Sequence, residues 1–319
     1  MTHHLMKLLH TFLTCAIIVS ASLADSVHAE STVVIVDDRA LHAEYRKHMA
    51  AFVKEGNYTP HSKLVEQLAR TSCKLRLPAV GTKRMSPSEV YRLRIDATVM
   101  VGKSHRCNNP KCENPLATIA SGVVIHEDGI VLTNYHVVAN KVPKLLCMGV
   151  MTHDGKAYLV DEILAADKKS DIAILQLKDA KGLDFAPVYR DEPVGNSATI
   201  ISHPTGKFFT LTQGLVSRYH KSSNGAAMMN VTADYAKGSS GGPVFNDRGD
   251  VIGLVANTVS IPYKHVPLHV NEKSEALEIA TKSKKTHTMS GRPLTIGTNH
   301  QMTLKNTAPS RAILDLIEQ

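Results

Sequence analysis

The stretch Lys237–Phe245, KGSSGGPVF, decides how the rest of this chain is interpreted. Two adjacent serines, Ser239 and Ser240, lie among glycines, and either hydroxyl could act as a nucleophile. A nucleophile elbow would require a helix directly after Ser240. Two glycines and a proline follow instead, and these residues disfavour a helix interior. The continuation PVFNDRGDVIGLV indicates a hairpin with its turn at Asp247–Asp250, so the stretch predicts a serine loop between β-strands.

Short runs rich in β-branched residues recur on both sides of the serine loop. Between residues 89 and 185 they are DATVMVG, ATIASGVVIH, GIVLTNYHVV, KAYLVDEIL and DIAILQL. Between residues 190 and 319 they are SATIISH, FFTLTQGLVSRY, AAMMNVTADY, GGPVF and VIGLVANTV. Turn signals separate the runs, which is typical of antiparallel strands. We therefore predict a mostly β protein with two antiparallel β-barrels, and not an alternating strand–helix fold.

The first 29 residues have the pattern of a cleaved signal peptide. Lys7 precedes an apolar run that extends to about Leu23, and the small residues Val27 and Ala29 stand where a signal peptidase would cut. A retained membrane anchor is the alternative, but the apolar run is short and is interrupted by Thr, Ser and His10. We expect an exported protein, periplasmic or extracellular, with no membrane anchor after signal removal.

Helices are expected at both ends of the predicted barrels. Residues 30–88 form a helical N-terminal extension, in which apolar residues at three- and four-residue steps predict an amphipathic helix from Asp37 to about Gly56. A second helix is expected over Ser62 to about Ser72. A C-terminal helix is expected at Ser310–Glu318, with Ser310 capping its first turn.

The charge balance argues against nucleic acid as a partner. The formal net charge is +8, yet no basic motif carries interleaved aromatic residues. A solvated basic face is the simpler interpretation. Nothing in the sequence calls for a cofactor.

Four cysteines follow the signal segment, and an even number in an exported chain suggests two disulfides. Cys107 and Cys112 could form a local bridge, or could bind zinc together with His105. The bridge is favoured because no second ligand pair stands at a comparable spacing. Cys73 and Cys147 would then pair by subtraction, although the sequence permits all three pairings. We expect no metal site.

Two further motifs supply possible companions for the serine. His136 follows an apolar strand in LTNYHVV, and Asp171 precedes the apolar run that begins at Ile172. The order is histidine, aspartate, serine, with intervals of 171 − 136 = 35 and 240 − 171 = 69 residues. In this interpretation Ser240 attacks a carbonyl, His136 moves the proton, and Asp171 fixes the histidine tautomer.

At these motifs the sequence resembles the chymotrypsin-fold serine peptidases, and within them the bacterial HtrA-type branch, from about Tyr91 to Leu316. The stretches that carry the resemblance are SGVVIHEDGIVLTNYHVV, SDIAILQL, HPTGKFFTLTQGLVS, KGSSGGPVFNDRGDVIGLVAN and LKNTAPSRAILDLI. The resemblance implies two barrels of the chymotrypsin type in residues 89–319, and an oxyanion hole built from the backbone N–H groups of Gly238 and Ser240. The short region after Ile261 leaves no room for a PDZ domain, so we do not expect regulation of the peptidase by such a domain.

The residue preference of such a site is open. Asp234 precedes Ser240 by six residues, where trypsin-like enzymes place the acid that receives Arg or Lys. If Ala256, Asn257 and Thr258 form the pocket wall, Thr258 would narrow the entrance, which favours a small aliphatic residue over a basic one. We expect an exported serine endopeptidase that acts on proteins or peptides. The alternative is a catalytically inactive binding protein on the same scaffold.

Overall fold

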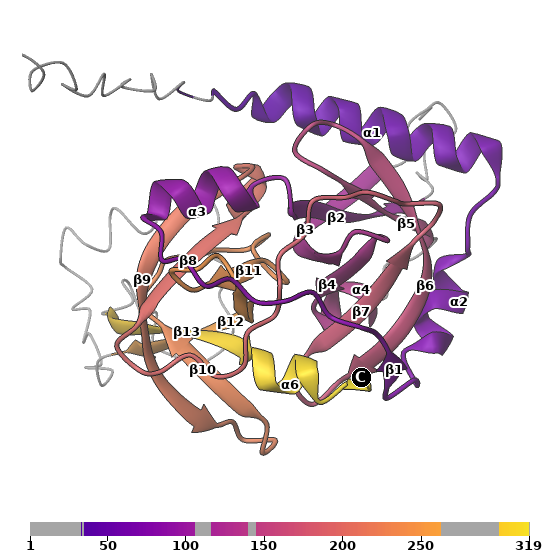
Figure 1. The fold of residues 1–319 in the computed structure, drawn as a ribbon. Coiled ribbons are helices and arrows are strands. Elements are labelled where there is room, and N and C mark those ends of the chain that lie inside the picture. Colours follow the sequence, from indigo (N-terminus) through magenta and orange to yellow (C-terminus); the bar gives the residue numbers. More distant parts are fainter. Residues whose placement is uncertain (1–32, 34, 106–115, 140–144, 263–299, 319) are drawn as a thin grey trace, which may run out of the picture. The chain divides into compact units, whose positions relative to one another are not determined.

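The computed structural model describes residues 33, 35–105, 116–139, 145–262 and 300–318. The chain divides into residues 1–36 and 37–319, and the architecture given below belongs to the second unit (Figure 1). The predicted signal segment, residues 1–29, lies outside the described residues. None of the helices in the described part of the chain has both the length and the apolar character needed to cross a membrane.

The first barrel is closed and antiparallel, in the order β2-β3-β4-β7-β6-β5. Its six strands are β2 (Thr98–His105), β3 (Leu116–His126), β4 (Ile130–Thr133), β5 (Leu145–Met151), β6 (Ala157–Asp167) and β7 (Ile172–Leu177). All of them lie within the range predicted for the first barrel, but β5 was absent from the predicted strands.

The second barrel is also closed and antiparallel, in the order β10-β13-β12-β11-β8-β9. Its strands are β8 (Ser197–Ser202), β9 (Thr210–Lys221), β10 (Ala227–Val231), β11 (Pro243–Phe245), β12 (Val251–Pro262) and β13 (His300–Pro309). β11 and β12 form the hairpin predicted after the serine loop, and β13 closes the barrel between β10 and β12. The two-barrel prediction is confirmed.

The first helix of the extension packs on the first barrel. Helix α1 (Asp38–Glu55) begins after Asp37, whose carboxylate accepts two backbone N–H bonds, and ends at Gly56, as predicted. The Tyr45 hydroxyl donates to the Gly149 carbonyl at 3.1 Å, and both Tyr45 and Met49 are fully buried. A Cβ at Gly149 would lie 2.5 Å from the Met49 sulfur, so this glycine lets the helix approach the barrel.

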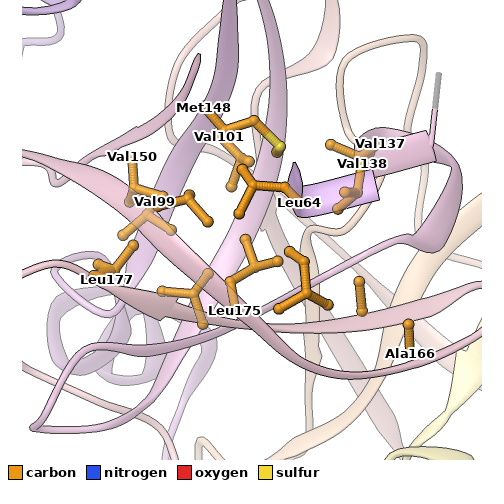
Figure 2. Close-up of a cluster of buried hydrophobic side chains, with 14 of the residues drawn as sticks. Leu64, Val99, Val101, Val137, Val138, Met148, Val150, Ala166, Leu175 and Leu177 are labelled. Carbon is orange, nitrogen blue, oxygen red and sulfur yellow. The ribbon is translucent and has the colours of Figure 1, made fainter. Parts of the chain in front are cut away.

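The second helix of the extension enters the core of the first barrel. Helix α2 (His61–Gln67) is shorter than predicted, and its Leu64 and the following Leu68 join the cluster of buried residues inside the barrel. Figure 2 shows Leu64 among side chains from β2, β5 and β7, together with Val137 and Val138. Burial of each such side chain contributes roughly 1.5–3 kcal/mol, so the extension is a structural part of the barrel.

A third helix, α3 (Pro87–Arg94), was not predicted. It begins with a capping box, in which Ser86 and Glu89 exchange hydrogen bonds with each other's backbone N–H groups, and Pro87 occupies its first position. The Arg94 side chain donates to the carbonyl oxygens of Gly249 at 2.6 Å and Phe185 at 2.7 Å. The helix therefore ties the hairpin of the second barrel to the segment that follows the first.

The C-terminal helix differs from its prediction. Helix α6 (Ser310–Leu314) is only five residues long, and Ser310 is its first residue and not its cap. The chain then forms β14 (Ile317–Glu318), which pairs in parallel with β1 (Cys73–Lys74) from the N-terminal extension. Ile313 and Leu316 are buried, and the strand pairing ends the helix earlier than predicted.

The predicted Cys73–Cys147 disulfide is wrong. Both cysteines are free: Cys73 lies in β1, whereas Cys147 is fully buried in β5 of the first barrel, so they belong to different sheets. Burial raises the pKa of the Cys147 thiol to about 12, which keeps it protonated and unreactive. Cys107 and Cys112 lie outside the described residues.

Candidate active site

His136 and Asp171 meet at the ends of two neighbouring strands. His136 lies in the short helix α4 (Tyr135–Ala139), one turn after β4, and Asp171 directly precedes β7, which pairs with β4. Asp171 Oδ2 lies 2.7 Å from His136 Nδ1, and Asp171 Oδ1 accepts the His136 backbone N–H at 2.9 Å. The Asn134 side chain donates to the Asp171 carbonyl at 2.9 Å. The pair therefore has the geometry of a histidine oriented by a carboxylate.

Two long-range contacts that were not predicted from the sequence hold helix α4 at the Val138 carbonyl. The Val138 carbonyl accepts from the Lys103 ammonium at 3.2 Å and lies 2.9 Å from Nε2 of His61. Burial lowers the pKa of Lys103 to about 8, and burial together with the Lys103 charge lowers the pKa of His61. A neutral His61 would donate its Nε2 proton to this carbonyl. The two side chains fix the C-terminal end of α4 at Val138, two residues beyond His136.

The two adjacent serines of the loop have different surroundings. Ser239 is fully buried, and its hydroxyl accepts a hydrogen bond from the Ser202 hydroxyl at 2.9 Å. Ser240 is half-buried, and its hydroxyl is bonded to no described residue. Of the two, only Ser240, the predicted nucleophile, has a hydroxyl that is not bonded to a described residue.

Two backbone N–H groups of the loop are also unused. The N–H groups of Ser239, Gly241 and Gly242 donate to carbonyl oxygens at 2.9–3.0 Å, whereas those of Gly238 and Ser240 donate to no acceptor within the described ranges. Gly238 has φ 100°, a conformation that side chains resist, and a Cβ there would lie 2.5 Å from the His203 carbonyl oxygen. The two free donors are those predicted for the oxyanion hole.

The serine loop is seated on strands of the first barrel. Ser121, in β3, donates through its hydroxyl to the Gly238 carbonyl at 2.9 Å, and its hydroxyl oxygen accepts the His203 N–H at 3.2 Å. The Ser121 N–H donates to the Ser240 carbonyl at 2.9 Å. The Thr133 hydroxyl, at the end of β4, donates to the Ser121 carbonyl at 2.9 Å. One serine thus connects the loop of the second barrel to the strands that lead to His136.

A cavity of about 430 Å³ opens beside the histidine, lined by Tyr135, His136, Ala139, Lys168 and Asp171. Ser240 is not among its lining residues, and no hydrogen bond between His136 and Ser240 is present in the described part of the chain. The structure brings His136 together with Asp171, and positions Ser240 in a separate loop. Catalytic hydrogen bonds are often long in free enzymes and tighten when substrate binds.

The residues predicted to set specificity line neither the cavity beside His136 nor another described cavity. The Asp234 side chain is 85% exposed, and its carboxylate pairs with the Lys305 ammonium at 3.2 Å. Ala256 is buried at a bulge of β12, while Asn257 and Thr258 are exposed. A carboxylate already paired and largely in water is a poor receptor for a basic side chain.

Among the described residues, no group of three or more His, Cys, Asp or Glu side chains could hold a metal ion. Of the zinc ligands considered from the sequence, His105 ends β2, and Cys107 and Cys112 lie outside the described ranges.

Comparisons with known proteins converge on one family. Residues 120–254 match the family model described as a trypsin-like peptidase domain. The chain is 34% identical over 160 residues to "Serine protease HTRA1" of Xenopus tropicalis, which covers 47% of this chain and 33% of the relative. It is 32% identical over 165 residues to "Probable periplasmic serine endoprotease DegP-like" of Chlamydia muridarum, covering 49% of this chain and 31% of the relative. The chain thus spans about a third of the length of these relatives.

A solved structure supports the same fold. The structure titled "HtrA-type protease AlgW with decapeptide" is similar with a TM-score of 0.51 and 16% sequence identity, over 72% of this chain and 66% of that chain. At this identity, the likeness concerns the two-barrel fold alone.

Proposed function

Because this chain contains a trypsin-like peptidase domain homologous to the HtrA and DegP serine proteases, we propose that it is a serine endopeptidase that hydrolyses peptide bonds through His136, Asp171 and Ser240. The observation that carries the proposal is the combination of an aspartate-bound histidine with Ser240, whose hydroxyl and N–H, like the Gly238 N–H, have no hydrogen-bond partner among the described residues.

The chemistry proceeds in two steps. His136 takes the proton from the Ser240 hydroxyl as its oxygen attacks the peptide carbonyl, and returns the proton to the leaving amine. Asp171 keeps the Nδ1 proton on the ring, so that Nε2 faces the serine, and stabilises the imidazolium. The N–H groups of Gly238 and Ser240 stabilise the oxyanion, each typically by about 3–4 kcal/mol. Water, activated by His136, then hydrolyses the acyl-enzyme.

The proposed substrates are proteins or peptides outside the cytoplasm. Residues 1–29 have a signal-peptide pattern, and relatives such as the Chlamydia muridarum protein are named periplasmic. Export to the periplasm or to the extracellular space is therefore part of the proposal.

We further propose a preference for a small aliphatic residue before the cleaved bond. The pairing of Asp234 with Lys305 supports this choice over a basic residue. Comparing kcat/KM for peptides that end in alanine and in arginine tests it, and faster cleavage after arginine would contradict it.

Labelling with a fluorophosphonate probe tests the catalytic proposal directly. The wild-type protein should be labelled at Ser240, as located by mass spectrometry, whereas Ser240→Ala and His136→Ala should not react. A folded wild-type protein that takes up no label would instead support the alternative, a non-catalytic binding protein on the same scaffold.

A further inference from the structure

A groove of about 850 Å³ runs along α1, away from His136 and Asp171. One wall is a face of the helix that carries Arg39, Arg46 and Lys47, with Ala43 between them. The opposite wall is the turn Pro204–Gly206, which follows β8 of the second barrel. The groove therefore lies where the N-terminal extension meets the second barrel.

The cations of the groove have no carboxylate partner among the residues that the structure describes. In the described part of the chain, no carboxylate oxygen lies within 4.0 Å of the charged nitrogens of Arg39, Arg46 or Lys47. Asp38 is the one carboxylate in the lining, and its two oxygens are already occupied by the Lys207 ammonium at 3.1 Å and the Phe208 N–H at 2.9 Å. The groove thus presents three uncompensated positive charges.

The turn that forms the opposite wall is fixed in place. Asp38 binds its far end through Lys207 and Phe208, and the Thr205 N–H donates to the Lys237 carbonyl at 2.6 Å. Thr205 has φ 50°, a left-handed conformation that a threonine adopts only when its surroundings hold it there. The groove is therefore already formed, and Thr205 of its wall is bonded to Lys237, the residue that directly precedes Gly238.

The groove has the length of a short peptide. Its helical wall extends from Arg39 to Ala50, a separation of 11 residues, or roughly 16 Å at 1.5 Å per residue. An extended chain rises about 3.3 Å per residue, so about five residues would span it.

From these features we infer that the groove is a second binding site for polypeptide substrates, which holds an acidic stretch of about five residues beside the serine loop. Carboxylates of the bound stretch pair with Arg39, Arg46 and Lys47, and the small side chain of Ala43 lets the backbone approach the helix. This inference rests on the proposed peptidase function, because it assigns the groove to the same substrate.

The shape of the groove favours a peptide over other anionic partners. None of its lining residues is a tryptophan, tyrosine or phenylalanine, so it offers no surface on which the bases of a single-stranded nucleic acid could stack. A membrane surface is broad, whereas this site is a recess between a helix and a turn. An extended acidic segment matches both its charge and its form.

Fluorescence anisotropy with Ser240→Ala measures this binding without catalysis. The probe is a fluorescein-labelled pentapeptide of alternating aspartate and glutamate, and its control is the matching asparagine and glutamine peptide. We expect the acidic peptide to bind at least tenfold more tightly, and its affinity to fall as salt is added. Equal binding of the two peptides would overturn the inference.

Charge-matched variants locate the site. Replacing Arg39, Arg46 and Lys47 by alanine should raise the Kd at least tenfold. Replacing three exposed lysines outside the groove, Lys54, Lys74 and Lys221, removes the same charge and should change it less than twofold. Equal losses in the two triple variants would show a general charge effect and refute the site. If the groove variant fails to fold, Arg46→Gln alone should still weaken binding.

Two further measurements separate the remaining outcomes. Tighter binding of a single-stranded oligonucleotide, or of phosphatidylglycerol vesicles, than of the peptide would assign the groove to a different partner and overturn the inference. In the active protein, an acidic stretch on either end of a cleavable peptide should lower KM. Replacing Arg39, Arg46 and Lys47 by alanine should abolish this decrease in KM. Fluorophosphonate labelling tests the proposed peptidase function independently of the groove. A failure of the peptidase proposal is therefore distinguishable from a failure of the groove proposal.

Discussion

Both carboxylate oxygens of Asp171 are bound to His136, one to the ring at 2.7 Å and the other to the backbone N–H at 2.9 Å. Asp171 itself has φ 59°, a left-handed conformation that aspartate and asparagine tolerate better than most residues. A single residue therefore sets the orientation of the ring and the start of the helix that carries it.

Asp171→Asn is expected to lower kcat by about 10⁴ while the protein stays folded, because an amide at this position favours the wrong histidine tautomer. The control is Asp179→Asn, which also replaces a left-handed aspartate near the end of β7 but makes no contact with His136. The measurements are kcat on a peptide substrate and thermal unfolding. A loss below tenfold in Asp171→Asn would contradict the assigned role.

The two adjacent serines should respond in opposite ways. Ser240→Ala is expected to abolish peptide cleavage and to leave the unfolding free energy nearly unchanged. Ser239→Ala is expected to retain cleavage and to lose about 1 kcal/mol of stability, because it removes a buried hydrogen bond with Ser202. Urea unfolding and kcat/KM, measured on both variants, check this, and loss of cleavage with Ser239→Ala alone would reverse the assignment.

Gly238→Ala should remove the oxyanion donor from its position, because the new Cβ would meet the His203 carbonyl oxygen at 2.5 Å. We expect kcat to fall by about 10²–10³. Gly225→Ala is the matched control, since Gly225 also has a positive φ, and the nearest atoms to its added Cβ lie 3.7 Å away. It should cost about 1 kcal/mol of stability with an unchanged kcat. Similar values of kcat in the two variants would argue against an oxyanion role.

Stability should depend on pH through His203, which lies beneath the serine loop. Burial lowers the pKa of His203 to about 4 from its ordinary value of 6.5, so between these values the unfolded chain binds more protons than the folded one. The free energy of unfolding should therefore fall as the pH drops from 6.5 towards 4, by on the order of 2 kcal/mol at pH 5.

His203→Asn tests this dependence, since its side-chain oxygen can replace Nδ1 as the acceptor of the Phe209 N–H. Urea unfolding at pH 8 and pH 5 should show a smaller decrease in the variant than in the wild type. Equal decreases would assign the pH dependence to other groups.

The parts of the structure that depend on local pattern were predictable from the sequence. Alternating and β-branched runs located most strands, and the order of the histidine, aspartate and serine motifs led to the prediction of Ser240 as the nucleophile. Helix α3 was not predicted, although Ser86 and Glu89 carry its capping signal. The helix has only eight residues and only Val90 among them is buried, which is too little to show an apolar periodicity. The run that forms β5 was also missed.

Long-range contacts could not be derived in this way. Lys103 and His61 meet at the Val138 carbonyl although 35 and 77 residues separate them from Val138, and no local pattern encodes that meeting. The Cys73–Cys147 pairing failed for the same reason: counting cysteines cannot tell which sheets they enter. Likewise, the contacts of Asp38 with the turn after β8 depend on packing of the extension against the folded barrels.

The pairing of β1 with β14 also constrains the timing of folding. Cys73 pairs with Ile317, a separation of 244 residues, and its N–H donates to the Leu316 carbonyl at 2.9 Å. During synthesis, β1 leaves the ribosome long before its partner exists, so its edge stays open until Ile317 and Glu318 emerge. The extension can fold against the first barrel early, but the β1–β14 pair forms only after the strands of both barrels have been synthesised.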